Sequence, residues 1–119
     1  MTVLRPNRLL VTGGSGFIGT NLVECAIGRA LPLLNVDIQP PLRKDHKSTW
    51  CKVDILDSDA LNRACAEFKP DWVVHLAART DCDENTTVER DYQVNTAGTQ
   101  CVLAAVRATP SVSRLLVTS

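Results

Sequence analysis

The sequence predicts an α/β fold, a doubly wound parallel sheet of five strands in the order 3-2-1-4-5. Short apolar runs alternate along the chain with segments whose apolar residues recur at helical spacing, as in strand–helix–strand units. The runs at residues 9–12 and 72–78 are continuously apolar, which is typical of strands covered by helices on both faces. Right-handed crossovers then place the topological switch point between the first and fourth strands, where the carboxyl ends of the strands form a binding edge.

The predicted strands occupy residues 9–12, 33–37, 49–53, 72–78 and 114–119. The first helix begins after Gly16 and ends near Gly28, because its apolar residues (Ile18, Leu22 and Cys25 or Ala26) follow helical spacing and Pro32 lies just beyond. Asp57 or Ser58 caps a second helix that ends before Pro70. A third helix is predicted over about 88–108, before Pro110, and the polar segments 42–48 and 79–87 are predicted surface loops.

A glycine-rich turn, Gly13-x-x-Gly16-x-x-Gly19, joins the first strand to the first helix. So short a connection needs backbone angles and close approaches that residues without a Cβ tolerate. The N–H groups and the positive dipole end of the helix then favour an anion such as a pyrophosphate. The spacing differs from the Gly-x-Gly-x-x-Gly fingerprint, so a turn with a purely structural role is the alternative.

Composition excludes several classes of function. A chain of 119 residues is at most one domain, and 13 basic against 13 acidic residues give no electrostatic footprint for nucleic acid or an anionic membrane. No apolar run suits a leader or a membrane span, so a cytoplasmic protein is expected. The five cysteines and two histidines are too scattered for a zinc or disulfide framework, and no metal site is predicted. Cys25, Cys65 and Cys101 are expected on apolar helix faces, and Cys82 is expected to be inert in its acidic loop.

Two carboxylates follow predicted strands at the binding edge. Asp37 lies 24 residues past Gly13, where a dinucleotide fold places the acid that accepts hydrogen bonds from the adenosine ribose. A carboxylate there favours NAD and repels the 2′-phosphate of NADP, although Arg43 and Lys44 nearby could weaken that preference. The alternative for Asp37 is a solvated acid at a strand end. Asp54 could accept a hydrogen bond from an adenine amino group beside Ile55, with a turn as its alternative role.

The end of the fourth strand carries small residues. Ala77 and Ala78 would allow a flat ring or a ribose to approach the backbone, with ordinary tight packing as the alternative. His75, inside an apolar strand, is expected to be hydrogen-bonded to its surroundings and is given no catalytic role.

Six motifs occur in the order and spacing of the extended short-chain dehydrogenases/reductases: 12–19 (TGGSGFIG), Asp37, 53–55 (VDI), 75–78 (HLAA), 95–99 (NTAGT) and 116–119 (LVTS). More narrowly, the chain resembles the NAD-dependent epimerase/dehydratase group, typified by nucleotide-sugar epimerases and dehydratases. This resemblance implies a Rossmann-like NAD(P)-binding domain over residues 1–119, with NAD as the cofactor and a nucleotide sugar as the substrate of a complete enzyme.

The resemblance also assigns roles to single residues. The backbone of Gly16, Phe17 and Ile18 would hold the pyrophosphate, and Asp37 the adenosine ribose. The remaining cofactor contacts would come from Asp54 and Ile55 at the adenine, Leu76, Ala77 and Ala78 beside the nicotinamide half, Asn95 on the third helix, and Thr118 at the edge, in addition to Gly13 and Gly19 in the turn.

The sequence departs from the family in its catalytic segment. The family uses a Tyr-x-x-x-Lys pair, but Tyr92, the one tyrosine, is followed four residues later by Thr96. Ser119 is a shifted candidate for the family's catalytic Ser/Thr. We therefore expect an amino-terminal NAD-binding part, incomplete at the C-terminus, without turnover by itself and with an aggregation-prone edge at the fifth strand. The alternative is a short non-catalytic sensor or interaction module that binds a dinucleotide, as a monomer or homodimer.

Overall fold

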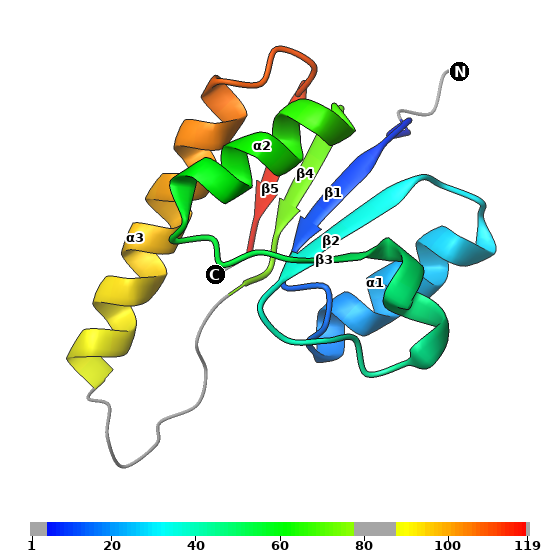
Figure 1. The fold of residues 1–119 in the computed structure, drawn as a ribbon, viewed down its shortest axis with the longest axis horizontal. Coiled ribbons are helices and arrows are strands. Elements are labelled where there is room, and N and C mark those ends of the chain that lie inside the picture. The colour runs from blue at the N-terminus through cyan, green and yellow to red at the C-terminus, as the bar shows by residue number, and fades with distance from the viewer. Residues whose placement is uncertain (1–4, 78–87, 119) are drawn as a thin grey trace.

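The computed structural model describes residues 5–77 and 88–118 and contains a five-stranded, all-parallel sheet in the order β3-β2-β1-β4-β5 (Figure 1). The predicted Rossmann-like topology is therefore confirmed. The strands are β1 (Leu9–Thr12), β2 (Leu33–Asp37), β3 (Trp50–Lys52), β4 (Trp72–His75) and β5 (Arg114–Val117). The helices are α1 (Phe17–Gly28), α2 (Ser58–Phe68) and α3 (Val88–Arg107), with a 3-10 helix η1 at Lys44–Thr49.

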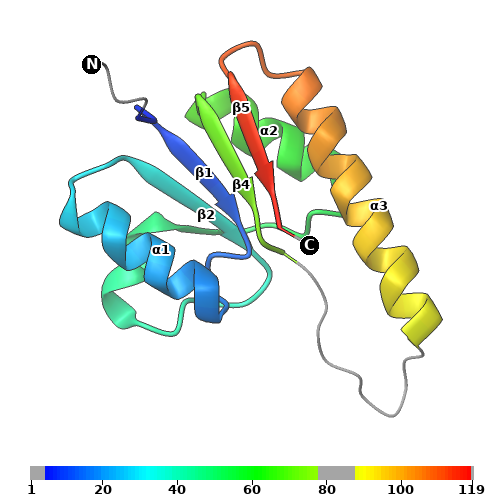
Figure 2. The same cartoon turned by 180° about the vertical axis from the view of Figure 1, so that it is seen from behind.

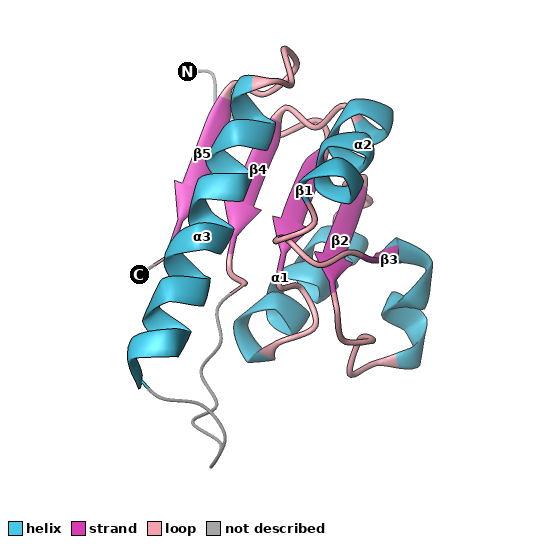
Figure 3. Cartoon of the chain, turned by 60° about the vertical axis from the view of Figure 1, so that its left-hand side comes forward, coloured by secondary structure: helices cyan, strands magenta, loops and turns pink. Residues whose placement is uncertain are grey.

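The sheet is covered on both faces, with α2 and α3 in front and α1 behind in Figure 3. Side chains alternate along β1 to supply both cores. Leu10 packs in the cluster that contains the buried residues of α2 and α3, whereas Leu9 and Val11 pack with Val23 and Ala26 of α1. Because all of β1 is buried, its run of apolar residues is explained by two-sided packing.

The strands are in a register that brings their carboxyl ends to one edge. Thr12, the last residue of β1, lies between Val36 of β2 and His75 of β4, and His75 in turn lies opposite Val117 of β5. This level edge is the predicted switch point between β1 and β4, and the glycine turn leaves the sheet from it.

β5 is at the edge of the sheet as predicted, but it is more exposed than its apolar sequence suggests, and two strands are shorter than predicted. β5 was expected to be covered on both faces, but Leu116 and Val117 are 50% and 49% exposed. Figure 2 shows β5 as the outermost strand, and among the described residues only β4 pairs with it. The predicted strands 72–78 and 114–119 also end earlier, at His75 and Val117. The β4 strand ends because the Ala77 N–H turns to the Thr12 side chain.

Two predictions of burial are wrong. Cys25 is exposed, because the buried stripe of α1 is formed by Gly19, Val23 and Ala26, whereas Cys65 is buried and Cys101 partly so. Segment 42–48 is not simply a surface loop, because η1 within it buries His46, which is 1% exposed and hydrogen-bonded to Glu24 (Nε2 to Oε2, 2.6 Å). Cys82 lies outside the described residues. No helix in the described part of the chain is long and apolar enough to cross a bilayer.

Candidate functional site

At the first and last glycines of the turn, neighbouring backbone leaves no room for a side chain. Gly13 has φ +79°, and a Cβ on it would lie 2.6 Å from the Ala77 backbone nitrogen. A Cβ on Gly19 would overlap the Gly13 carbonyl oxygen and the backbone of Gly14. These two glycines therefore let β1, the end of β4 and α1 meet at the switch point.

The end of β2 holds the turn through three backbone N–H groups. Gly13 N–H donates to the Val36 carbonyl (3.0 Å), Gly14 N–H to Asn35 Oδ1 (2.8 Å), and Ser15 N–H to Asp37 Oδ2 (3.0 Å). Buried Asn35 also donates from Nδ2 to the Ser15 hydroxyl (3.1 Å).

Asn35, Ser15 and the need for glycine at position 14 were missed by sequence reasoning. A Cβ on Gly14 would lie 2.5 Å from Asn35 Oδ1, so the two residues require each other. The available signal was an asparagine inside an otherwise apolar strand, since a buried amide must find partners.

The start of α1 is open beside this turn. Gly16 is the N-cap, is exposed, donates its N–H to the Gly13 carbonyl (3.3 Å) and supplies no side-chain cap. The N–H groups of Phe17 and Ile18 belong to the first turn, where a helix offers no internal acceptor. The side chains of these two residues are 82% and 64% exposed. Together with the positive end of the helix dipole, this arrangement suits an anionic group.

Asp37 lies next to this opening, at the end of β2. Its carboxylate accepts the N–H groups of Ser15 (3.0 Å) and Gln39 (2.9 Å), and its carbonyl accepts the indole N–H of Trp50 (2.9 Å). A carboxylate has about four acceptor positions, so these two bonds orient the group and leave capacity for a diol. Asp37 is therefore a fixed acceptor and not a freely solvated acid.

Arg43 forms ion pairs with Asp45 and Glu24 and not with Asp37 in the described contacts. Its guanidinium lies 3.1 Å from Asp45 Oδ1 and 3.5 Å from Glu24 Oε2. The hydrogen bond that Arg43 donates to the Asp45 carboxylate raises the pKa of Arg43, as do the negative charges of Asp45 and Glu24. Glu24, Asp45 and His46 also form the one grouping of potential metal ligands in the described ranges, but the Arg43 cation already compensates these carboxylates.

Asp54 and Ile55 lie after β3. The Asp54 side chain accepts the Leu56 N–H (3.0 Å) in a local turn. Asp57 accepts the Ala60 N–H (3.1 Å), which confirms it as the predicted cap of the second helix. A Cβ on Gly98 of α3 would lie 2.6 Å from Ile55 Cδ1, so this glycine lets α3 approach Ile55.

His75 connects the sheet edge to α3. Its Nδ1 lies 2.6 Å from Thr12 Oγ1, and its Nε2 lies 3.2 Å from Thr99 Oγ1. Thr99 donates its hydroxyl to the Asn95 carbonyl (3.0 Å), and Thr12 Oγ1 accepts the Ala77 N–H (3.2 Å). Burial lowers the pKa of the His75 imidazole. The prediction that His75 is bonded to its surroundings is confirmed, whereas Thr99 as its partner was missed.

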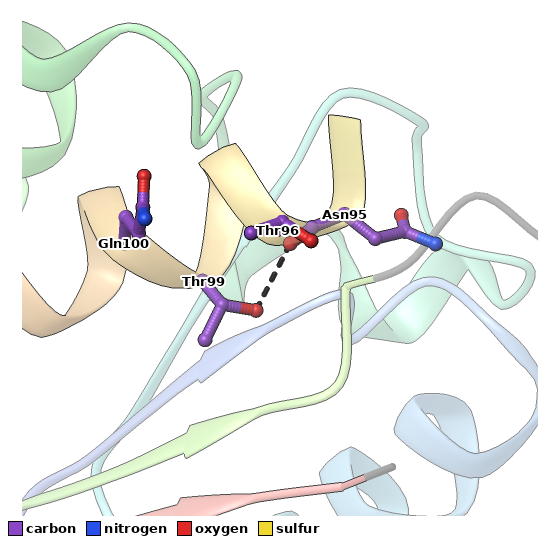
Figure 4. Close-up of a pocket in the computed structure, with 4 residues that line it drawn as sticks. All are labelled: Asn95, Thr96, Thr99 and Gln100. Carbon is purple, nitrogen blue, oxygen red and sulfur yellow. Dashed lines mark hydrogen bonds between the residues drawn. The ribbon is translucent and has the colours of Figure 1, made fainter. Parts of the chain in front are cut away.

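Asn95 lines an open depression on α3, together with Thr96, Thr99 and Gln100, of about 280 Å³ (Figure 4). The other predicted residues lie at the sheet edge. Leu76 donates its N–H to the Thr12 carbonyl (2.9 Å), and Thr118 donates its hydroxyl to the His75 carbonyl (3.2 Å). Ala78 and Ser119, both predicted site residues, lie outside the described residues.

The structure thus brings the glycine turn, Asp37 and Ala77 into direct contact, and joins Thr118 and Asn95 to the same edge through His75. In the described contacts Ile55 meets α3, Asp54 bonds only within its own turn, and neither residue touches the glycine turn. At the carboxyl ends of β1, β2 and β4, hydrogen bonds and close contacts between the site residues themselves therefore hold the site together.

Comparisons with known proteins agree on one family. The NAD dependent epimerase/dehydratase family matches residues 9–119. A probable dTDP-glucose 4,6-dehydratase of Sinorhizobium fredii is 36% identical over 110 residues, which cover 84% of this chain and 31% of that protein. The dTDP-L-rhamnose 4-epimerase of Burkholderia thailandensis is 30% identical, over 94% of this chain and 34% of the relative.

A solved structure shows the same fold. UDP-glucose 4-epimerase of Thermus thermophilus, crystallised as a complex with NAD, is 33% identical and superposes with a TM-score of 0.77 over 91% of this chain and 36% of that chain. The chain therefore spans about a third of the length of the relatives it matches.

Proposed function

The chain belongs to the NAD dependent epimerase/dehydratase family, and from that premise we propose that residues 1–119 form its NAD(P)-binding Rossmann domain and bind NAD. One observation supports this most strongly. The N–H groups of residues 13–16 are all used within the turn and β2, so the next N–H groups, those of Phe17 and Ile18, are the ones presented to a pyrophosphate.

Each half of the dinucleotide has proposed partners. Asp37, oriented by Ser15 and Gln39, binds the adenosine ribose, while Asp54 and Ile55 contact the adenine. Leu76, Ala77 and Ala78 lie beside the nicotinamide half, with Thr118 at the same edge and Asn95 supporting the ring side from α3. Gly13 and Gly19 shape the turn, and Ser119 takes the place of the family's catalytic Ser/Thr.

NAD, when bound, supplies a reversible acceptor for hydride. The described residues contribute binding and orientation to such a reaction. We propose that the complete protein acts on a nucleotide sugar, since the relatives named above are enzymes of dTDP- and UDP-linked sugars. By itself the chain is expected to show no turnover, because it lacks the Tyr-x-x-x-Lys pair. The cytoplasmic location and a homodimer stay predictions from the sequence.

The preference for NAD over NADP also has a structural argument. Asp37 offers a carboxylate where NADP would place its 2′-phosphate, and two like charges at hydrogen-bond distance repel. Arg43, one of the two nearby cations that could have accepted the phosphate, is held between Asp45 and Glu24. Both features favour NAD.

Isothermal titration of the folded chain with NAD and with NADP tests the proposal. We expect saturable binding of NAD and weaker binding of NADP by the wild type. In Asp37→Asn, which keeps the size of the side chain but removes its charge, the affinities for NAD and NADP should differ less. A chain that is folded by circular dichroism and gives no saturable heat with NAD would refute the proposal.

A further inference from the structure

The protons of the Thr12–His75–Thr99 chain can be assigned from its partners. Thr99 has one hydroxyl proton, which it donates to the Asn95 carbonyl (3.0 Å), so Thr99 Oγ1 must accept at its second contact, from His75 Nε2–H (3.2 Å). A neutral imidazole protonated at Nε2 leaves Nδ1 as an acceptor, and the Thr12 hydroxyl donates to it at 2.6 Å.

The opposite tautomer fits less well. With the proton on Nδ1, Thr99 would have to turn its hydroxyl away from the Asn95 carbonyl and toward Nε2. The Thr12 oxygen would then accept from both His75 and the Ala77 N–H, and its own proton would have no acceptor among the described contacts. An unpaired polar group at a buried position costs roughly 1–3 kcal/mol, so the Nε2–H form is favoured.

This chain of bonds joins parts of the site that are far apart in sequence. Thr12 directly precedes the glycine turn and holds the Ala77 N–H, while Asn95, one helical turn before Thr99, lines the depression on α3. A second described contact in this part of α3 is the close approach of Gly98 to Ile55. The second contact is apolar and has little directionality, whereas the His75 bonds fix a distance and an orientation.

We propose that His75 is a positioning residue: as the neutral Nε2–H tautomer, it sets the place of Asn95 on α3 relative to the glycine turn and the end of β4. The functional part of this inference rests on the proposed binding of NAD, because it treats these two elements as halves of one dinucleotide site. The tautomer and the placement of α3 do not depend on NAD.

The first experiment is NMR of the chain labelled with ¹⁵N-histidine, without cofactor. Long-range ¹H–¹⁵N spectra separate the two tautomers and the imidazolium, and His75→Gln identifies the His75 signals against those of His46. We expect the proton on Nε2 at neutral pH. A proton on Nδ1, or a charged ring, would overturn the proposal.

The second experiment separates positioning from stability. Thr99→Val removes the hydroxyl that links His75 to α3 while keeping the side-chain shape, and Thr99→Ser restores it. The control is Thr109→Val, because buried Thr109 donates the same kind of bond, to the Ala105 carbonyl (2.7 Å), just beyond the far end of α3.

We expect Thr99→Val to weaken NAD binding about 3- to 10-fold and to shift the Asn95 amide resonance, with Thr99→Ser close to the wild type. Thr109→Val should leave the NAD affinity within about twofold of the wild type, even if it lowers the melting temperature as much as Thr99→Val does. An unchanged Asn95 resonance in Thr99→Val, or equal losses of affinity in the Thr99→Val and Thr109→Val variants, would refute the positioning role. If the wild type does not bind NAD, the proposed function fails, and the tautomer and the Asn95 resonance still decide this inference.

Discussion

Gly16→Ala separates the requirements of folding from those of binding. Gly16 has φ −79° and ψ −175°, an extended conformation that alanine adopts readily, and the new Cβ would lie 3.6 Å from its nearest neighbour, the Gly13 carbonyl oxygen. The folded chain therefore has room for the methyl group. Any loss of binding must then come from the space that the ligand occupies.

This geometry gives the expected effect of Gly16→Ala on the free energy of unfolding and on the affinity for NAD. Alanine is a poorer N-cap than glycine by about 0.5–1 kcal/mol, but it restricts the unfolded chain and returns about 0.4–1 kcal/mol. The free energy of unfolding should thus change by less than about 0.5 kcal/mol. A methyl group on Gly16, the residue directly before the Phe17 and Ile18 N–H groups, should remove at least one charge-assisted hydrogen bond to the proposed pyrophosphate, roughly 1.5–3 kcal/mol, or about 10- to 100-fold in affinity.

The assay is calorimetric titration with NAD at fixed ionic strength, combined with urea unfolding of the same preparations. Gly28→Ala is the matched control, because Gly28 ends α1 far from the turn and a Cβ there would meet nothing within 4 Å. A Gly16→Ala variant that binds NAD within twofold of the wild type would refute the placement of the pyrophosphate at this helix start.

Three further predictions concern stability. Gly13→Ala should lower the free energy of unfolding by about 2–4 kcal/mol in urea, because φ +79° is unfavourable for alanine and the Cβ would meet the Ala77 backbone. Asn35→Ala should cost about 1–3 kcal/mol by the same measurement, since it leaves the Gly14 N–H buried without its acceptor. Burial raises the pKa of the Asp71 carboxyl, but backbone N–H groups just before β1 outweigh this and lower the pKa. The ionised Asp71 carboxylate therefore stabilises the fold above pH about 4, and this stabilisation is lost as the pH falls through the folded-state pKa. The melting temperatures of the wild type and Asp71→Asn should accordingly converge in acid.

The strand order and the helices were predictable because they depend on local patterns. Runs such as residues 9–12 and 72–75 are apolar on both faces, and Pro70 and Pro110 mark helix ends. The apolar pattern of β5 resembles that of β1 and does not by itself predict that Leu116 is half exposed. The exposure follows from the edge position of β5, which the predicted strand order includes.

The candidate site was predictable where spacing alone carries the information. The positions of Gly16 and Asp37 follow from a strand–turn–helix–strand unit of ordinary length. Asn35, Thr99 and Gly98 were missed because their roles arise from contacts with residues 20 or more positions away. His46 was missed for the same reason, since its hydrogen-bond partner Glu24 lies 22 positions away, on α1.

The central place of β1 has a consequence for the order in which the chain can fold. β1 is made before its two partners, β2 and β4, and Thr12 is separated from His75 by 63 residues. Closing so long a loop is entropically costly, and parallel pairing of this kind is slow. During synthesis β1 can pair with β2, but its other edge stays unpaired until β4 emerges. A chain stalled before Trp72 is therefore the species most in need of a chaperone.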